Sequence, residues 1–458
     1  MEDKRIQIIN HIKERLKDLK ELNQTYSEEK INKLADNLLL TNKSLEEICT
    51  LIDNKFSNQL RKVTHNNYLA SLREYYISSI SKLKKGNNCY LLSYDEGVKV
   101  LEQALITPIK DINPNLKLVK VNNSTKGYTK ENSINNDYEL ILSDIAYLLS
   151  IPYAKTYRIF KSDMQPIGVL NITFEEPKEK FLNLEDALRF IKEESPKFTL
   201  KEELVNIHDR KGRLGLKEIY TKEDCHKNLE YVLKLFSALP DIKEDNLKQL
   251  EKDYFQMKIF ELLTNSLNNN LSNIGIIVNK EKSHYTYKLS PSYNKFTVSL
   301  PSLGKTKTIC NFDIVEKNLL LETILTYYYI DVKELLSLIV TNKVTLLSII
   351  NQVIKEHLEY DEYNTYHEII KDNLHMIKET YLEFKNRIPL SKEDEIKNQE
   401  NNELYNSRIT PFMDNYISDE YEGPDKGSIV INAIITLVLL ITVGIIAFII
   451  YSVSKMNM

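Results

Sequence analysis

The end of the chain carries the strongest constraint on its fold, an uncharged apolar segment of 25 residues. Residues 429–453 read IVINAIITLVLLITVGIIAFIIYSV. As an α-helix this segment would be about 37 Å long, enough to cross the roughly 30 Å hydrocarbon core of a bilayer. A helix that is apolar all round is typical of a membrane span. We therefore predict a single transmembrane helix here, a tail anchor, because only five residues follow it.

The bulk of the chain is expected on the cytoplasmic side of that membrane. The N-terminal residues MEDKRIQIINHIKERLKDL are charged and amphipathic and lack the apolar core of a secretory signal. The flanking charges do not decide the orientation. The chain has four cysteines, far apart in sequence, and they form no CxxC or Cys/His cluster. This sparse usage fits a reducing compartment and indicates no zinc site.

An acidic, polar segment precedes the apolar one. Residues 391–427 hold ten acidic and four basic side chains, a local charge of −6, with few apolar residues. Such a composition is typical of a solvated tether, and we assign residues 388–428 to it. Its acidity would be repelled by an anionic leaflet and would hold the folded part off the surface. A spacer without an electrostatic role is the alternative.

The remaining residues have the composition of an ordinary globular protein. The chain has 458 residues, a formal charge of −4 and 42% hydrophobic residues, and its length predicts two or three folded units. This balance of charge gives no argument for a nucleic-acid partner, and none is expected.

Residues 1–60 are predicted to form a small helical unit. Apolar residues recur at helical spacings of three and four in two segments, the first containing Ile12 and the second Ile31. A third helix opens at Ser44, which forms a capping box with Glu47. The unit is either an adaptor that binds a protein partner or a helical cap on the main domain. A helical linker is predicted over residues 61–87.

The chain from residue 88 to residue 387 has the pattern of an α+β domain. The runs CYLLSY, LKLVKV, KTYRIF and IGVLNITF predict strands, with one helix (138–150) between the second and the third. From residue 182 the pattern is mostly helical, interrupted by the strand pair IGIIV and YTYKLS. We predict a small sheet-rich lobe over about 88–175 and a larger helical lobe over about 176–387.

The segment Phe260–Val278, FELLTNSLNNNLSNIGIIV, concentrates asparagines between a helical run and a strand. A phosphoryl-transfer site needs a lysine paired with a helix glutamate, a loop carboxylate that orients the attacking hydroxyl, and an asparagine and a second carboxylate that hold magnesium. The pattern permits the interpretation that this segment is such a phosphoryl-transfer loop, with amides in place of the carboxylates.

The same segment resembles the HipA-like serine/threonine kinase family. That family has a loop of the type F-D-x-L-x-x-N-x-D-R-H-x-x-N-x-G, followed by a hairpin and an L-x-P-x-Y-D segment. FELLTNSLNNNLSNIG aligns with the first pattern without a gap, and LSPSYN (289–294) aligns with the second, with substitutions at several positions. DIAYLLSIPYAKTYRIF and IGVLNITF also resemble family segments. The resemblance covers residues 88 to about 385 and implies a two-lobed kinase-like fold.

The resemblance implies roles for several residues. Asn273 stands at the metal-binding asparagine, Asn268 at the catalytic aspartate, and Asn294 at the second magnesium-binding aspartate. Three further loop positions also differ from the family: Ser266, Asn269 and Asn270. Lys120 is the first candidate for the nucleotide lysine and Lys117 the second, with Glu139 as the partner. A solvated lysine and a surface glutamate remain the plain alternative for that pair.

The two changes from aspartate to asparagine predict impaired phosphotransfer. An amide is a poor proton acceptor, and magnesium prefers anionic oxygen ligands. No aspartate lies between Asp253 and Asp313, where Glu261 and Glu281 are the only carboxylates and match no loop position. ATP and magnesium are therefore expected to bind weakly or not at all.

Three functions remain open from the sequence. The first is a membrane-tethered pseudokinase that acts as a binding or regulatory platform for a protein partner. The second is a divergent active Ser/Thr kinase or another nucleotide-dependent transferase. The third is a non-catalytic helical membrane scaffold. Substrate, pathway and oligomeric state have no signature in the sequence.

Overall fold

A computed structural model describes most of the chain between residues 2 and 387. The described ranges are 2–19, 26–41, 43–81, 89–95, 98–113, 116–122, 125–131, 136–160, 166–176, 178–194, 205–207, 214–216, 221–266, 271–281, 284–291, 298–299, 308–309 and 314–387. The predicted tether (388–428) and transmembrane helix (429–453) lie outside them. All described residues except Val98 belong to one compact unit of the chain.

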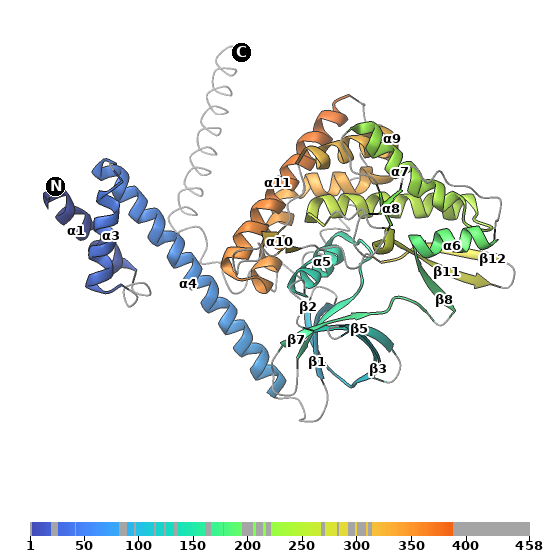
Figure 1. Ribbon diagram of the computed structural model, residues 1–458, viewed down its shortest axis with the longest axis horizontal. Helices are drawn as coiled ribbons and strands as arrows, with labels where there is room; N and C mark the ends of the chain where they lie inside the picture. The colour runs from blue at the N-terminus through green and yellow to red at the C-terminus, as the bar shows by residue number, and fades with distance from the viewer. Residues whose placement is uncertain are drawn as a thin grey trace, which may run out of the picture. The chain divides into compact units, whose positions relative to one another are not determined.

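Three helices form the N-terminal part, as predicted: α1 (Glu2–Asp18), α3 (Glu28–Leu39) and α4 (Leu45–Ser81) (Figure 1). The capping box of α4 is confirmed, because the Glu47 amide donates to Ser44 Oγ at 3.2 Å and the Ser44 amide donates to Glu47 Oε2 at 2.7 Å. The apolar faces of the three helices share one buried core, formed by Ile8, Ile12, Leu16, Ile31, Ala35, Ile48, Ile52 and Phe56.

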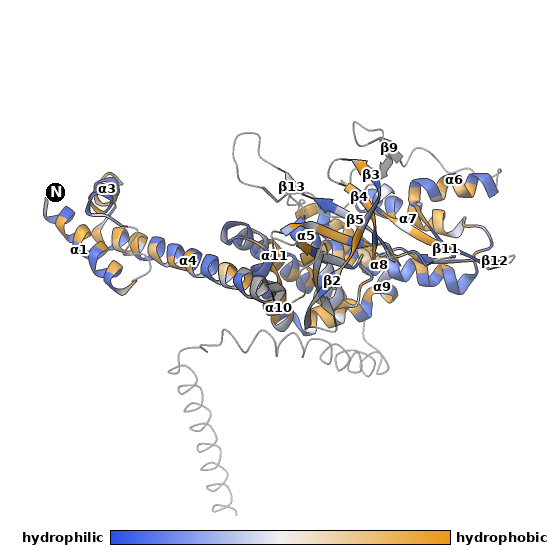
Figure 2. Cartoon of the chain, turned by 90° about the horizontal axis from the view of Figure 1, so that it is seen from below, coloured by the Kyte–Doolittle hydropathy of each residue, from blue (hydrophilic) through white to orange (hydrophobic). Residues whose placement is uncertain are grey.

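Helix α4 continues past the boundary predicted at residue 60. It runs for 37 residues and contains no Gly or Pro that would end it. Polar and apolar residues alternate along its turns (Figure 2). The predicted helical linker from residue 61 is thus the second half of α4 and not a separate helix.

The sheet-rich part is a curled seven-stranded sheet in the order β2-β1-β6-β7-β5-β4-β3 (Figure 1). Every strand pair whose register is described is antiparallel. The strands are β1 (Cys89–Asp95), β2 (Val98–Ala104), β3 (Ile106–Asn113), β4 (Leu116–Val121), β5 (Thr125–Glu131), β6 (Thr156–Phe160) and β7 (Pro166–Ile172). The four predicted strand runs correspond to β1, β4, β6 and β7.

The predicted helix between the strands is α5 (Asn136–Leu149), which connects β5 to β6. It is mostly hydrophobic (Figure 2), and eleven of its fourteen residues are buried. It packs against β6 and β7 on one side and against α10 (Lys343–His357) on another. This helix therefore lies between the sheet and the helical part, and its position affects both.

The helical part also contains a second, three-stranded sheet in the order β12-β11-β8. Its helices are α6 (Leu184–Glu194), α7 (Lys222–Ser237), α8 (Glu244–Thr264), α9 (Ile314–Thr341), α10 and α11 (Tyr360–Lys385), with the 3₁₀ turn η2 (Leu271–Asn273). Its strands are β8 (Glu179–Asn183), β11 (Gly275–Glu281) and β12 (His284–Leu289), with the short pairs β9 (Val205–Ile207) and β10 (Leu214–Leu216), and β13 (Val298–Ser299) and β14 (Thr308–Ile309). The predicted hairpin is confirmed as β11–β12. The third strand of that sheet, β8, was not predicted.

Helix α8 is the core of the helical part. Every residue from Met257 to Thr264 is buried, so this end of the helix is enclosed on all sides. Helices α7, α9 and α11 pack around it. It leads directly into the asparagine-rich segment, which therefore starts from a fixed point.

No helix within the described residues is by itself long and apolar enough to cross a bilayer. Helices α9 and α10 pass that criterion only when taken together, and they are bent by 82° at the break between them. Both pack against α11 in the helical part. The described residues thus leave the prediction for residues 429–453 untested.

Candidate functional site

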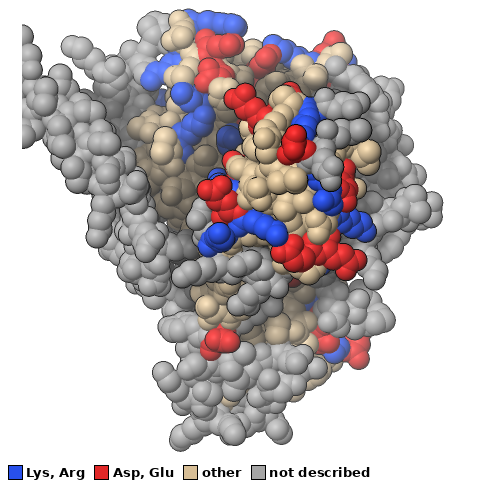
Figure 3. All heavy atoms as spheres, turned by 90° about the vertical axis from the view of Figure 1, so that its left-hand side faces the viewer, with Lys and Arg blue, Asp and Glu red and all other residues tan. Residues whose placement is uncertain are grey.

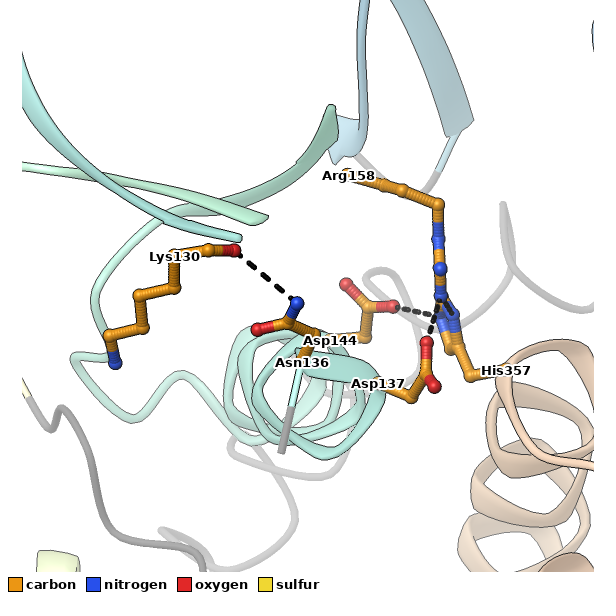
Figure 4. Close-up of polar contacts among 6 residues, drawn as sticks. All are labelled: Lys130, Asn136, Asp137, Asp144, Arg158 and His357. Carbon is orange, nitrogen blue, oxygen red and sulfur yellow. Dashed lines mark hydrogen bonds and ion pairs between the residues drawn. The ribbon is translucent and has the colours of Figure 1, made fainter. Parts of the chain in front are cut away.

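A largely buried ion pair joins the sheet to α5. Nζ of Lys130 on β5 lies 2.6 Å from Oε1 of Glu139 on α5, and the two side chains are 18% and 5% exposed. Asn136, the first residue of α5, donates its side-chain amide to the carbonyl oxygen of Lys130 at 3.3 Å (Figure 4). The entry from β5 into α5 is therefore held by both the backbone and the side chain of Lys130.

Asn171 on β7 completes the polar group around Glu139. Its Nδ2 donates to Glu139 Oε2 at 2.9 Å, so both oxygens of the carboxylate accept a hydrogen bond. The buried Oδ1 of Asn171 has no hydrogen-bond partner among the described residues. A buried acceptor of this kind needs a water molecule or a ligand group to satisfy it.

Strand β7 can reach this group because residue 168 is a glycine. A Cβ added to Gly168 would lie 2.0 Å from the carbonyl oxygen of Lys130, which is far inside van der Waals contact. Any other residue here would push β7 away from β5. The close approach of the two strands is what allows Asn171 to share Glu139 with Lys130.

The structure places a different lysine beside Glu139 than the two predicted candidates. Lys120 lies on β4, where it is exposed and faces Lys126 in the register with β5. The second candidate, Lys117, is also on β4 and pairs with Glu131 at 3.0 Å. Glu139 is the predicted helix glutamate, but its partner is Lys130. The segment TKGYTKE of β5 lacks an apolar alternation. The sequence pattern therefore indicates β4 as the last strand before the helix.

The asparagine-rich segment begins with a tightly bonded turn at the end of α8. Asn265 adopts the left-handed conformation (φ 55°), and its amide and that of Ser266 both donate to the carbonyl of Glu261. Thr264 and Ser266 share a hydrogen bond of 2.8 Å between their hydroxyl groups, and all of these residues are buried. Ser266 thus has a structural role at the root of the loop.

Two of the predicted site residues, Asn268 and Asn294, lie outside the described residues, as do Asn269 and Asn270. Asn273 is described: it ends the 3₁₀ turn η2 and is 7% exposed. The next residue, Ile274, accepts a hydrogen bond of 2.8 Å from the amide of Leu184. The far end of the loop is therefore fastened to the start of α6, just before β11 begins.

Helix α11 connects the root of this loop to α5. The hydroxyl of Tyr366 on α11 donates to the carbonyl of Thr264 at 2.8 Å. The Tyr366 ring packs edge-on against that of Tyr138 on α5, with a centroid distance of 5.6 Å. Tyr138 directly precedes Glu139. The loop root and the ion pair are thus separated by only two packed aromatic side chains.

Tyr153, which follows α5, lies near the same two features. Its ring centroid is 6.0 Å from that of Phe260 on α8. Burial raises the pKa of Tyr153 well above its ordinary value, and the negative charges of Glu139, and to a lesser extent Glu261, raise it further. One buried phenol is therefore near both the helix glutamate and the helix that leads into the loop.

The carboxylates nearest in sequence to the asparagine loop are used elsewhere or lie at a distance. Glu261 is fully buried, and its Oε2 lies 2.8 Å from Lys258 Nζ on the same helix. Burial alone would lower the pKa of Lys258, but Glu261, with smaller contributions from Tyr254 and Cys225, outweighs that effect and the pKa is raised. Glu281 is at the turn end of the β11–β12 hairpin, about 20 Å along the strand from Gly275.

Side chains of both signs are interspersed over the described residues on the face shown in Figure 3. A polyanion needs a patch of one sign. The mixture of charges on this face therefore does not favour a nucleic-acid partner.

Comparisons with known proteins give structural neighbours at low similarity. No protein-family model and no curated protein matches the chain. One similar structure is that of a Helicobacter pylori proinflammatory kinase, CtkA, with 13% identity, a TM-score of 0.34, and 66% of this chain and 97% of that chain covered. Another is the Shewanella oneidensis MR-1 toxin–antitoxin system of HipA, HipB and operator DNA, with 13% identity, a TM-score of 0.32, and 62% and 67% covered. At 13% identity neither assigns an activity or a partner to this chain.

Proposed function

We propose that the chain is a nucleotide-binding protein of the kinase type, with phosphotransfer impaired, that acts as a regulatory platform on a membrane. The observation that carries the proposal is the Lys130–Glu139 pair. Protein kinases use such a pair, from a strand and a nearby helix, to position the phosphates of ATP. Lys130 is the residue to which we assign this role, in place of Lys120.

Impaired phosphotransfer follows from the chemistry of the loop. Asn268 and Asn294 stand where the resembled family has aspartates, and Asn273 alone keeps the metal-binding residue type. Among the nearby carboxylates, Glu261 is bound to Lys258 inside α8, and Glu281 lies at the far end of a hairpin. These residues do not fit a magnesium site, because hard cations need anionic oxygens around them.

Attachment to a membrane is proposed for residues 429–453, with residues 388–428 as the tether. The support is the uncharged composition of the segment over a length that spans a bilayer. A chain truncated after Leu390 should partition to the soluble fraction, and the full chain should stay with membranes through a carbonate wash. Persistent membrane association of the truncated chain would contradict the anchor.

Nucleotide binding is tested by thermal unfolding of the full-length chain with millimolar ATP. Ligand at 100 times its dissociation constant stabilises by about 2.7 kcal/mol, which raises Tm by several degrees. Lys130→Ala should remove this shift, and Lys126→Ala, an exposed lysine on the same strand, should keep it. The shift should persist in EDTA. No shift in the unmodified chain would favour the helical scaffold instead.

Loss of phosphotransfer is tested by incorporation of labelled phosphate from ATP. The unmodified chain should show none above the Lys130→Ala background. The double variant Asn268→Asp, Asn294→Asp restores both charges and is expected to gain metal-dependent incorporation. Incorporation by the unmodified chain that Lys130→Ala abolishes would favour the divergent active kinase over the pseudokinase.

A further inference from the structure

Four side chains outside the proposed nucleotide site connect α5 to the helical part (Figure 4). Arg158 on β6 donates from Nη2 to Asp137 Oδ1 at 2.7 Å, and the same nitrogen lies 3.1 Å from His357 Nδ1. His357, the last residue of α10, places its Nε2 3.2 Å from Asp144 Oδ2. His357 and Asp144 are 10% and 8% exposed, so this pair is largely removed from water, whereas Arg158 and Asp137 are 22% and 29% exposed.

The partners of His357 define its hydrogen bonding. A guanidinium has only donors, so His357 Nδ1 must accept the hydrogen bond from Arg158. The remaining ring nitrogen, Nε2, then carries the proton and donates to the carboxylate of Asp144. This is the neutral Nε2–H form of the ring. Both contacts are therefore made with complementary donors and acceptors, each to a charged group.

The two aspartates bind the network on one face of α5, and Glu139 is on another. Asp137 and Asp144 are seven residues apart, which is close to two full turns. Glu139, two residues after Asp137, points to a direction about 200° away around the helix axis. Lys130 and Asn171 hold the Glu139 side. Arg158 and His357 hold the opposite side, so α5 is clamped between them.

We propose that Arg158 and His357 are positioning residues that hold α5 where Glu139 can pair with Lys130. This inference deepens the proposed function, and the part of its test that uses ATP rests on that function. The hydrogen bonds of these two residues reach α5 at Asp137 and Asp144. They act through α5, because a shift or rotation of this helix would carry the Glu139 carboxylate away from β5.

The long helix α4 contacts the end of α10 that carries His357. His65 on α4 is buried, and its Nε2 lies 2.9 Å from the carbonyl oxygen of Leu358, the residue directly after His357. The His65 ring also stacks on Tyr363 of α11, with a centroid distance of 4.9 Å. The end of α10 that carries His357 is thus held by α4 as well as by α5.

The first test reads the ion pair without any nucleotide. In the full-length chain, the acylation rate of the Lys130 amine is measured by mass spectrometry against that of Lys126, which is exposed on the same strand. His357→Phe, which removes both hydrogen bonds of the ring, should raise the relative rate by about 5-fold or more, since coupling within one network is of that size. Hydrogen exchange of residues 136–149 should rise in parallel.

Matched variants separate positioning from general destabilisation. His357→Gln keeps a donor and an acceptor and should retain most of the protection of Lys130. His226→Phe replaces a histidine that stacks on Tyr327 at 4.1 Å, away from α5, and should leave the rate unchanged. Arg158→Gln is a second, independent disruption that should reproduce the effect of His357→Phe, and it serves alone where His357→Phe does not fold.

The nucleotide arm compares ATP with adenosine. Loss of positioning should weaken ATP binding by about 5-fold or more and leave adenosine binding unchanged, because Lys130 is assigned to the phosphates. An unchanged Lys130 rate in folded His357→Phe and Arg158→Gln would overturn the inference, as would an equal rise in His226→Phe. If the unmodified chain binds no ATP but its Lys130 is exposed by these variants, the proposed function fails and the positioning stands.

Discussion

The hydroxyl of Tyr366 donates a hydrogen bond of 2.8 Å to the carbonyl oxygen of Thr264, the last residue of α8. This carbonyl is at a helix end, where no later amide of the same helix is available to it. Tyr366 is fully buried, and burial raises the pKa of its phenol well above the ordinary value. The phenol therefore stays protonated and keeps donating at neutral pH, and the bond fixes the point from which the asparagine loop departs.

Tyr366→Phe should loosen that loop. The change removes the donor and leaves the Thr264 carbonyl buried without it, at an expected cost of about 1–3 kcal/mol in the free energy of unfolding. Urea denaturation measures the cost, and hydrogen exchange of residues 265–273 should increase. Tyr254→Phe is the matched control, because Tyr254 is equally buried but its hydroxyl has no partner among the described residues. Equal destabilisation by both variants would contradict the role given to Tyr366.

Glu139→Gln should destabilise the fold strongly. The substitution leaves the Lys130 ammonium in a site that is only 18% exposed, without its counter-charge. Removing one partner of a buried pair costs about 3–5 kcal/mol. The comparison is Lys252→Gln, which breaks the ion pair with Glu334 between α8 and α9, where the side chains are 38% and 23% exposed. That change should cost about 1 kcal/mol or less, and a larger loss there than at Glu139 would refute the ranking.

Lys317 should make the stability depend on pH. It is 1% exposed, and burial lowers its pKa to about 8, against an ordinary value of 10.5. Between these two values the unfolded chain binds more protons than the folded chain, so the free energy of unfolding contributed by Lys317 rises with pH. The gain over the whole window is about 3 kcal/mol.

The test for Lys317 compares the free energy of unfolding of the unmodified chain with that of Lys317→Met. Both are measured by urea denaturation from pH 7.5 to 9.5. The free energy of unfolding of the unmodified chain should rise relative to that of the variant as the pH rises. Other groups that titrate in this range are common to both chains and cancel in the difference. A constant difference would show that the Lys317 ammonium is not disfavoured by folding. Its bond to Asn373, 2.9 Å long, should also be lost in the variant.

Cys225 should resist thiol reagents in the folded protein. It is fully buried, and burial raises the pKa of its thiol to about 12, so almost no thiolate forms at neutral pH. Labelling at Cys225, followed by mass spectrometry of the peptide, should occur only at the rate of global unfolding. Cys49, which is partly exposed, is the internal reference. Labelling of Cys225 as fast as Cys49 would contradict its burial.

Local pattern identified the elements whose residues follow a clear period. The capping box at Ser44 and the helix that forms α5 were both predictable from the sequence. The strands β2, β3 and β5 were missed, because segments such as TKGYTKE carry polar residues on both faces. Lys130, the lysine that pairs with Glu139, lies on one of these strands. Lys130 has no sequence signal of its own except its place directly before the helix.

By itself, the sequence determined the apolar segment at 429–453, the helical faces, and the asparagines at 268 and 294, since these depend on residue type and short spacing. Only the tertiary structure decided that Lys130 meets Glu139 and that His357 reaches α5 from 213 residues beyond Asp144 in the chain. Such pairings depend on how strands and helices stack. The energy of a buried contact depends on residues that are neighbours in space. When those residues are distant in the chain, their contact produces no periodic pattern in the sequence.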